Sequence, residues 1–264
     1  MSVRRMTILV AGATGGIGDA VSRRLAAAGH RLVLAARNGD RLERLRADLE
    51  EGSPVGHEAV AVDMTADSSI AAFAAALASR AIDLDGAVLM PPQPHRSNDP
   101  LPSNDEWTNL FQGSFIGPLA TLKAAIERMH PDPARGIRAK IVIISGITSA
   151  QVLGHYATAN VLRLAWLGQA KTMAFALGPR GIHVNTLSLG GTLSPWYRAS
   201  LEGRAASAGV SFEEQLQRET DNIPLGKYGE PSEVAIAVQG LLSSFSDHMT
   251  GLNILHDGGF TRAY

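Results

Sequence analysis

The chain has 264 residues, enough for one large α/β domain with its own core. Its 24 Lys and Arg balance 25 Asp and Glu, and a formal net charge of −1 excludes an electrostatic case for a nucleic-acid partner. With no cysteine the chain has no disulfide, thiolate chemistry or cysteine metal site, and its 8 histidines show no pair spacing typical of metal ligands.

We expect no membrane segment, because no apolar run approaches the length that crosses a bilayer. The N-terminal residues lead straight into a short apolar run, without a long apolar leader or a small-residue cleavage site. These features predict a cytoplasmic protein.

The first expected element is a short buried strand, followed by a glycine-rich turn and a helix. The turn contains Gly12, Thr14, Gly16 and Gly18, and Ile17 begins an amphipathic helical pattern. Elements in this order present free backbone N–H groups and a positive helix dipole end to a pyrophosphate. Gly12 permits the tight turn, Gly16 the approach of phosphates, and Gly18 close packing of helix on strand. We therefore assign these five residues to a dinucleotide site.

Strand-like and helix-like patterns alternate along the whole chain, which favours one parallel sheet with helices on both faces. The expected strands cover residues 7–11, 31–35, 58–62, 87–90, 140–145, 183–188 and 253–255. The expected helices cover residues 16–28, 40–50, 68–80, 105–129, 156–178 and 231–243. No repeat or linker interrupts this order, so residues 1–264 are expected to form a single domain.

Two longer segments have no regular pattern. One is proline-rich, at residues 91–102, and the other covers residues 190–222 with a short helix expected at 211–219. Both follow the carboxyl ends of strands, where open α/β sheets bind their ligands. We expect residues 190–222 to form a lid over a substrate.

The residue after the second strand indicates which dinucleotide binds. An acidic side chain there would bind the ribose 2′-hydroxyl of NAD, whereas an arginine accommodates the 2′-phosphate of NADP. The sequence has Arg37 at this point and no carboxylate before Asp40. Because a guanidinium meets a dianion with a planar fork of donors, we expect NADP(H). The alternative is that Arg37 is only a solvated residue at the start of a loop.

Several further motifs follow one another along the chain. They are Val60-Ala61-Val62-Asp63, Gly181-Ile182-His183-Val184-Asn185, Leu189-Gly190, Ile223-Pro224-Leu225-Gly226, Gly229-Glu230-Pro231 and Asp257-Gly258-Gly259. With the glycine loop, they resemble the short-chain dehydrogenase/reductase family over nearly the whole chain. The resemblance implies a doubly wound parallel sheet of about seven strands, a Rossmann fold, in a dimeric or tetrameric homo-oligomer. It also implies that Asp63 lies against adenine and that Met90, Gly190 and Ser194 line the cofactor site.

The family's catalytic set is Asn, Ser, Tyr and Lys, in which the tyrosine exchanges a proton with the carbonyl oxygen. A first reading pairs Tyr156 with Asn160, which would put Asn in place of Lys. A gapless count back from Asn185 instead places Ala159 in the tyrosine position and Arg163 in the lysine position.

The same count places Gly146 in the serine position, and the preceding helix leaves Ser114 where the asparagine is expected. All four positions therefore depart from the family pattern. The chain resembles a divergent branch, similar to β-ketoacyl carrier-protein reductases but without the usual four residues.

Helix geometry indicates what replaces them. Tyr156 and Arg163 are spaced to share one helix face, so Tyr156 would act as a displaced acid whose anion Arg163 stabilises. Arg163 would also touch the ribose or phosphates of the cofactor, and Ser145 and Ser114 would supply hydroxyls. Alternatively, Tyr156 only packs its ring at a helix start. Because an arginine cannot relay a proton, His155 and His95 are candidate sources of it.

The favoured function is an NADP(H)-dependent oxidoreductase that moves a hydride to or from a carbonyl or hydroxyl of a small organic or acyl-type substrate. Loss of the usual acid need not abolish the reaction, since a general acid typically contributes about 10²–10⁴-fold. Two alternatives stay open. One is a non-redox cyclase, dehydratase or isomerase on the same scaffold, and the other is a catalytically silent NADP(H)-binding protein.

Overall fold

The computed structural model describes residues 4–51 and 55–263, and this part of the chain contains one sheet of seven parallel strands. Their order is β3-β2-β1-β4-β5-β6-β7. The strands are β1 (Thr7–Ala11), β2 (Arg31–Ala36), β3 (Glu58–Ala61), β4 (Gly86–Leu89), β5 (Ala139–Gly146), β6 (Ile182–Leu189) and β7 (Asn253–His256). The order reverses direction between β1 and β4, and the fold class expected from the sequence is confirmed.

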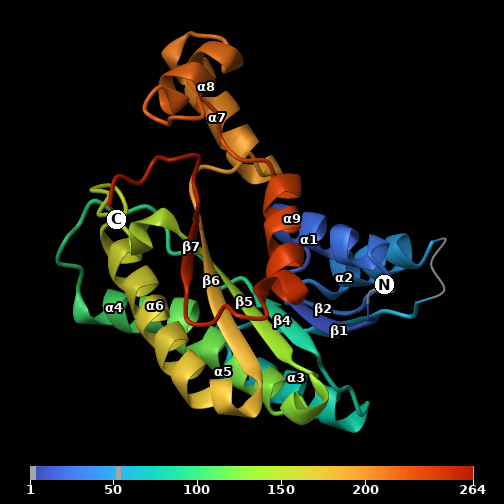
Figure 1. Cartoon of the computed structure of the whole chain (residues 1–264). Coiled ribbons are helices and arrows are strands. Elements are labelled where there is room, and N and C mark those ends of the chain that lie inside the picture. Colours follow the sequence, from blue (N-terminus) through green and yellow to red (C-terminus); the bar gives the residue numbers. More distant parts are fainter. Residues whose placement is uncertain (1–3, 52–54, 264) are drawn as a thin grey trace.

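Helices cover both faces of the sheet (Figure 1). The α-helices are α1 (Gly16–Ala27), α2 (Gly39–Glu50), α3 (Asp67–Ser79), α4 (Asn104–Phe111), α5 (Gly117–Ile126), α6 (Ala157–Leu177), α7 (Pro195–Ala208), α8 (Phe212–Thr220) and α9 (Pro231–Leu242). Short 3-10 turns are η2 (Pro133–Arg135), η3 (Ile147–Ser149), η4 (Gly178–Arg180) and η5 (Ser244–Ser246). One apolar core joins the sheet to α1, α2 and α9, and a second joins it to α3, α5 and α6.

The central strands are apolar because both of their faces are covered. Every residue of β5 is buried, including Lys140, whose ammonium pairs with Asp247. No helix within the described ranges combines the length and the apolarity that a bilayer crossing needs.

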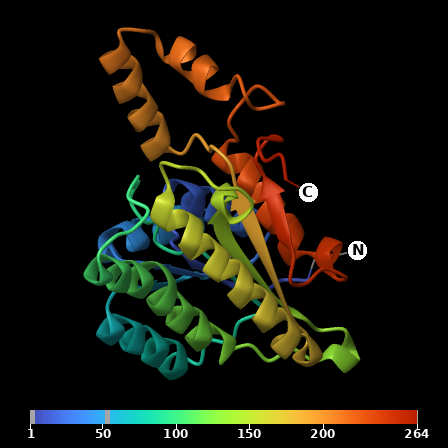
Figure 2. The same cartoon turned by 90° about the vertical axis from the view of Figure 1, so that its left-hand side faces the viewer.

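The segment from 190 to 222 differs from the expectation. Instead of one short helix it contains two, α7 and α8, which project beyond the carboxyl edge of the sheet as a hairpin (Figures 1 and 2). Few residues of α7 are buried, and its apolar residues form no continuous face, so no periodic pattern marks it. Its boundaries do carry signals, since the Ser194 side chain caps it, Pro195 begins it and Gly209 follows with φ +65°.

The helix expected over residues 105–129 is divided. A π-helical turn, η1 (Gln112–Ile116), separates α4 from α5. At the start of α5, a Cβ on Gly117 would lie 1.7 Å from the Met64 carbonyl oxygen, so only glycine permits this approach. A π turn within a helix often marks a functional region, and Ser114 lies in this one.

His30 and His57 are buried, and we expect them to make the fold less stable in mild acid. Nδ1 of His30 accepts a hydrogen bond from the Met6 N–H at 3.2 Å, and Nδ1 of His57 accepts one from the Leu32 N–H at 3.1 Å. Burial is the main cause that lowers the pKa of both. The unfolded chain therefore takes up protons near pH 6.5 while the native state resists them, so stability is full above that pH and falls below it.

We expect the free energy of unfolding, measured by urea titration, to decrease between pH 7 and pH 5. The double variant His30→Asn/His57→Asn should flatten this decrease, because the amide oxygen keeps the acceptor and removes the titration. An unchanged pH dependence in the double variant would show that these histidines are not the cause.

Candidate active site

The glycine loop has the close contacts that a dinucleotide-binding turn requires. Gly12 has φ +98°, a conformation that side chains disfavour. A Cβ on Gly18 would lie 2.1 Å from the Gly12 carbonyl oxygen, so α1 can approach β1 only with glycine there. Helix α1 begins at Gly16 without a side-chain cap, which leaves its first N–H groups for a ligand.

Gly16 is contacted by the start of the α7–α8 hairpin. A Cβ on Gly16 would lie 2.5 Å from Cδ of Pro195 and 3.2 Å from Cβ of Ser194. The Ser194 hydroxyl accepts the Tyr197 N–H at 3.3 Å, so it caps α7. The glycine loop and the segment expected to form the lid therefore meet at Ser194. Met90 also contacts the loop, because its Cβ would lie 2.9 Å from a Cβ placed on Gly12.

A basic group follows β2. Arg37 is exposed and makes no hydrogen bond or ion pair within the described residues. Arg41, which the sequence analysis did not single out, donates a hydrogen bond to the Thr14 carbonyl oxygen at 2.8 Å. Arg41 lies in the first turns of α2, close to Arg37 in sequence, and this proximity was the available signal. A guanidinium group suits a phosphate monoester, because its planar donors match the phosphate oxygens.

Asp63 follows β3, as expected. Its carboxylate accepts hydrogen bonds from the Thr65 hydroxyl at 2.7 Å and the Thr65 N–H at 2.9 Å. These bonds, with the charge of Arg37, lower the pKa of Asp63. The carboxylate is therefore a fixed acceptor at this edge of the sheet.

At the end of β5, an arginine occupies the space beside a glycine. A Cβ on Gly146 would lie 1.9 Å from Nη1 of Arg163 and 2.3 Å from its Cζ. Since real contacts of a Cβ are essentially never below 3.0 Å, no other residue fits at 146 while the guanidinium stays. The gapless count placed Gly146 in the serine position and Arg163 in the lysine position, and the structure brings the two residues into contact.

Arg163 is held there by neutral groups. Its Nη1 donates to the Thr148 hydroxyl at 3.3 Å, and its Nη2 donates to the Gln93 side-chain oxygen. Its Nε is shielded from solvent and has no acceptor among the described residues. Burial lowers the pKa of Arg163, and the nearby Tyr156 partly offsets this effect. Gln93 belongs to the proline-rich segment and could not be identified from sequence periodicity.

Tyr156 lies just before α6 and is not on the helix face that the sequence analysis assumed. Its hydroxyl accepts a hydrogen bond from Nε of Arg96 at 3.1 Å, and the Arg96 guanidinium stacks 5.3 Å from the ring centroid. The backbone also ties this point to the proline-rich segment, because the Ala157 N–H donates to the Ser97 carbonyl at 3.0 Å. Arg96 is therefore a site residue that the sequence did not reveal.

The first reading, with Asn160 in the lysine position, has no support in the contacts of the described residues. The Asn160 amide bonds the backbone N–H and carbonyl of Leu153 at 3.3 and 3.1 Å. Ala159, in the tyrosine position of the gapless count, is 1% exposed. The Asn160 side chain thus closes a loop and does not support Tyr156.

The candidate hydroxyls differ in their availability. The Ser145 hydroxyl is buried and has no hydrogen-bond partner in the described structure. Ser114 is buried in the π turn, and its carbonyl accepts Nε1–H of Trp166 at 2.9 Å. The Ser149 hydroxyl is bonded to Ser188 at 2.8 Å and to Asn253 at 3.3 Å, so it serves the β6–β7 junction.

The histidines considered as proton sources are placed differently. His95 is 68% exposed and faces Glu106 at 3.7 Å. The His155 ring lies 4.5 Å from the Tyr156 ring, and burial with the charge of Arg96 lowers its pKa. His155 is therefore beside the candidate acid, and His95 is at the surface.

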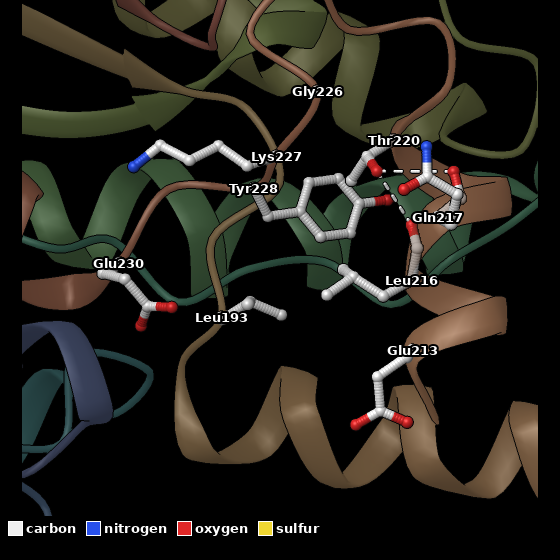
Figure 3. Close-up of a pocket in the computed structure, with 9 residues that line it drawn as sticks. All are labelled: Leu193, Glu213, Leu216, Gln217, Thr220, Gly226, Lys227, Tyr228 and Glu230. Carbon is white, nitrogen blue, oxygen red and sulfur yellow. Dashed lines mark hydrogen bonds between the residues drawn. The ribbon is translucent and has the colours of Figure 1, made fainter. Parts of the chain in front are cut away.

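A cavity of about 350 Å³ lies beneath the α7–α8 hairpin, and neither Arg163 nor Tyr156 lines it (Figure 3). Its lining comes from α8 and from the segments before α7 and α9: Leu193, Glu213, Leu216, Gln217, Thr220, Gly226, Lys227, Tyr228 and Glu230. The Tyr228 ring contacts the backbone at Gly191, where a Cβ would lie 2.1 Å from it. Tyr228 and Tyr197 both bond to Glu219, which joins the hairpin to the body.

The residues fit a dinucleotide. The uncapped N–H groups of α1 and the closely packed glycines before it would hold the pyrophosphate. The two arginines after β2 would bind a further phosphate. Within the described ranges, no group of three or more His, Asp or Glu side chains lies close enough to hold a metal ion.

Comparisons with known proteins agree with this arrangement. A family model described as enoyl-(acyl carrier protein) reductase matches residues 12–261. L-Rhamnose 1-dehydrogenase (NAD(P)(+)) of Azotobacter vinelandii is 28% identical over 260 residues, which cover 96% of this chain and 95% of that enzyme.

Two solved structures extend the similarity to the fold. L-Sorbose reductase from Gluconobacter frateurii, complexed with NADPH and L-sorbose, is 24% identical with a TM-score of 0.88, covering 100% of this chain and 99% of that chain. An NADPH-bound short-chain oxidoreductase from Pseudomonas aeruginosa PAO1, described as containing an atypical catalytic center, is 27% identical with a TM-score of 0.82, covering 98% of both chains. Given this fold and a family match over nearly its whole length, the chain belongs to the short-chain dehydrogenase/reductase family, in the group whose model is described as enoyl-(acyl carrier protein) reductase.

Proposed function

We propose that the protein is an NADP(H)-dependent oxidoreductase with a non-standard active site, acting on a carbonyl or hydroxyl group of a small organic or acyl-type substrate. The observation that carries this proposal is the Arg163 guanidinium beside Gly146, at the carboxyl end of β5. By resemblance, this is where the family has the serine that polarises the carbonyl. A fixed cation there stabilises negative charge on a reacting oxygen.

The cofactor is bound by three parts of the chain. Arg37 binds the 2′-phosphate and Asp63 the adenine, and the bound cofactor supplies the hydride. The backbone of the glycine loop binds the pyrophosphate through five residues: Gly12, Thr14, Gly16, Ile17 and Gly18.

The reacting oxygen is held by the guanidinium of Arg163, which also contacts the ribose. Tyr156 is the proton donor in the reducing direction: its hydroxyl oxygen accepts the Arg96 N–H, so its own proton remains free for the substrate. Ser145 has a buried hydroxyl without a partner among the described residues and can orient the substrate, while Ser114 occupies the π turn behind Trp166.

The rest of the pocket is supplied by loops at the carboxyl edge of the sheet. Met90, Gly190 and Ser194 line the cofactor side, and residues 190–222 cover the substrate. Met90 and Ser194 support this placement through their close approach to Gly12 and Gly16.

Support for NADP(H) comes from Arg37 and Arg41 and from the NADPH-bound relative that is 27% identical. That relative is described as having an atypical catalytic center, which is a precedent for a departure from the usual four residues. The proposal is tested by following NADPH absorbance with a panel of ketones, aldehydes and enones. Absence of NADPH consumption across the panel would contradict it, and product formation without any nicotinamide would favour a non-redox reaction.

The position of Arg37 predicts a preference for NADPH over NADH. Arg37→Ala should weaken NADPH binding by about 10–100-fold, since a charge-assisted hydrogen bond contributes roughly 1.5–3 kcal/mol, and should leave NADH binding nearly unchanged. The measurement is a fluorescence titration with both cofactors. Arg44→Ala is the matched control, because Arg44 lies close by on α2 and its side chain bonds the Asp40 carbonyl. Equal affinity of the unaltered protein for NADH and NADPH would remove this role from Arg37.

We also propose a homo-oligomer. Exposed apolar side chains gather on α6 and next to it: Val161, Leu164 and Phe175 are 44%, 54% and 79% exposed, and Ile116 is 50% exposed. Such a surface favours burial against a second copy. Sedimentation equilibrium should give a dimer or tetramer, and a monomer at all concentrations would contradict the proposal.

A further inference from the structure

Arg163 is a partly buried cation without an anionic partner among the described residues. No carboxylate lies within 4.0 Å of its guanidinium in the described ranges, and both of its hydrogen-bond partners are neutral. Burial lowers the pKa of Arg163 and is the largest effect on it, whereas the nearby Tyr156 raises this pKa. A guanidinium stays charged at every ordinary pH, so its charge is uncompensated within the part of the chain that the structure describes.

Arg204 and Arg31 are also partly buried, and each is paired with a carboxylate. Arg204 makes two bonds with Glu219, at 2.8 and 3.0 Å, and Arg31 bonds Glu58 at 2.8 Å. Burying a charge is costly unless it is paired and hydrogen-bonded. The unpaired state of Arg163 therefore indicates that a ligand brings the negative charge.

The surroundings of Arg163 favour an anion as well. Arg96 lies on the Tyr156 ring and forms no ion pair within the described residues. Burial and Arg96 are the influences that lower the pKa of His155. By contrast, the cavity beneath the hairpin is lined by Glu213 and Glu230, and its Lys227 is paired with a glutamate of α9. An anion is thus better accommodated at Arg163 than in that cavity.

We propose that the substrate carries a carboxylate group, which Arg163 binds and Arg96 attracts at the rim of the site. A planar guanidinium matches a carboxylate with two parallel hydrogen bonds. In a 2-oxo acid the carboxylate adjoins the carbonyl, so the Arg163 N–H donors that Thr148 and Gln93 leave free can serve both groups. This inference rests on the proposed function, and it narrows the substrate class to oxo acids and hydroxy acids.

The test compares two small probes of similar shape, benzoate and benzamide, by isothermal titration calorimetry at constant ionic strength. The protein is saturated with NADP⁺, so the phosphates of the cofactor are already in place. Benzoate should bind at least about tenfold more tightly, a difference of about 1.4 kcal/mol. Arg163→Met should remove the preference, Arg163→Lys should keep part of it, and Arg96→Gln should reduce it.

Arg180→Gln is the matched control, because Arg180 is exposed in η4 at the other end of α6. It should keep the full preference. Equal binding of the two probes, tighter binding of inorganic phosphate than of benzoate, or an unchanged preference in the folded Arg163→Met and Arg96→Gln variants would overturn the inference.

Failure of the inference is distinguishable from failure of the proposed function. Benzoate preference without any NADPH oxidation would support the carboxylate site and contradict the reductase. NADPH oxidation with neutral ketones, together with equal binding of the two probes, would support the reductase and contradict the carboxylate site.

Discussion

Replacing Gly146 with alanine is expected to remove most of the activity while the fold remains intact. The new Cβ would lie 1.9 Å from Nη1 of Arg163, so the guanidinium must move and lose its bonds to Thr148 and Gln93. The displaced group is the end of a flexible side chain, so stability should change by only about 1 kcal/mol. Loss of one donor to a developing oxyanion typically lowers kcat by about 10²–10³-fold.

The measurement is kcat for NADPH oxidation, with thermal unfolding measured in parallel. Gly154→Ala is the matched control, because nothing lies within 4 Å of a Cβ at that nearby position. A double-mutant cycle adds a sharper test, since Gly146→Ala should cost little further activity once Arg163 is alanine. Activity within about twofold of the unaltered protein in Gly146→Ala would show that the position of Arg163 is not important for the reaction.

Gly18→Ala is expected to lower the stability of the fold strongly and to abolish cofactor binding. Its Cβ would lie 2.1 Å from the Gly12 carbonyl oxygen and 2.9 Å from Cα of Ala13, both of which belong to the backbone. The backbone cannot yield as a side chain can, so we expect a loss of about 1–3 kcal/mol or more. In a protein of this size, each kcal/mol lowers the Tm by about 2–4 °C.

Gly15→Ala serves as the stability control within the same loop. Its Cβ would lie 3.4 Å from the same Gly12 oxygen, and Gly15 has φ −77°, which alanine adopts readily. Differential scanning calorimetry should therefore show a much smaller decrease for Gly15→Ala. Similar Tm values for the two variants would contradict the packing role assigned to Gly18.

The fold could be predicted because its signals are local. The run of apolar residues in β5 and the glycine turn before α1 both depend on residues close together in sequence. The second helix of the hairpin was predicted and the first was not, because the apolar residues of α7 do not gather on one face. The π turn was also missed, since it depends on the contact of Gly117 with the Met64 backbone.

The active site could be predicted only in part. Counting along the chain assigned Gly146 and Arg163 to two of the family's catalytic positions, but it could not show that the guanidinium fills the space beside the glycine. Gln93 and Arg96 lie in a proline-rich segment without periodicity, and only tertiary contacts bring them to Arg163 and Tyr156. Tyr156 was expected on a helix face, but the helix begins one residue later, and the ring lies against Arg96.

We propose that Arg163, supported by the space at Gly146, takes the place of the family's usual catalytic groups. A crystal structure of the complex with NADP⁺ would test this role. We expect the Arg163 guanidinium to stay beside Gly146, and we expect it and the Tyr156 hydroxyl to be the polar groups nearest to C4 of the nicotinamide. Arg163 turned away from that carbon, with Asn160 in contact with the ribose behind Tyr156, would contradict it.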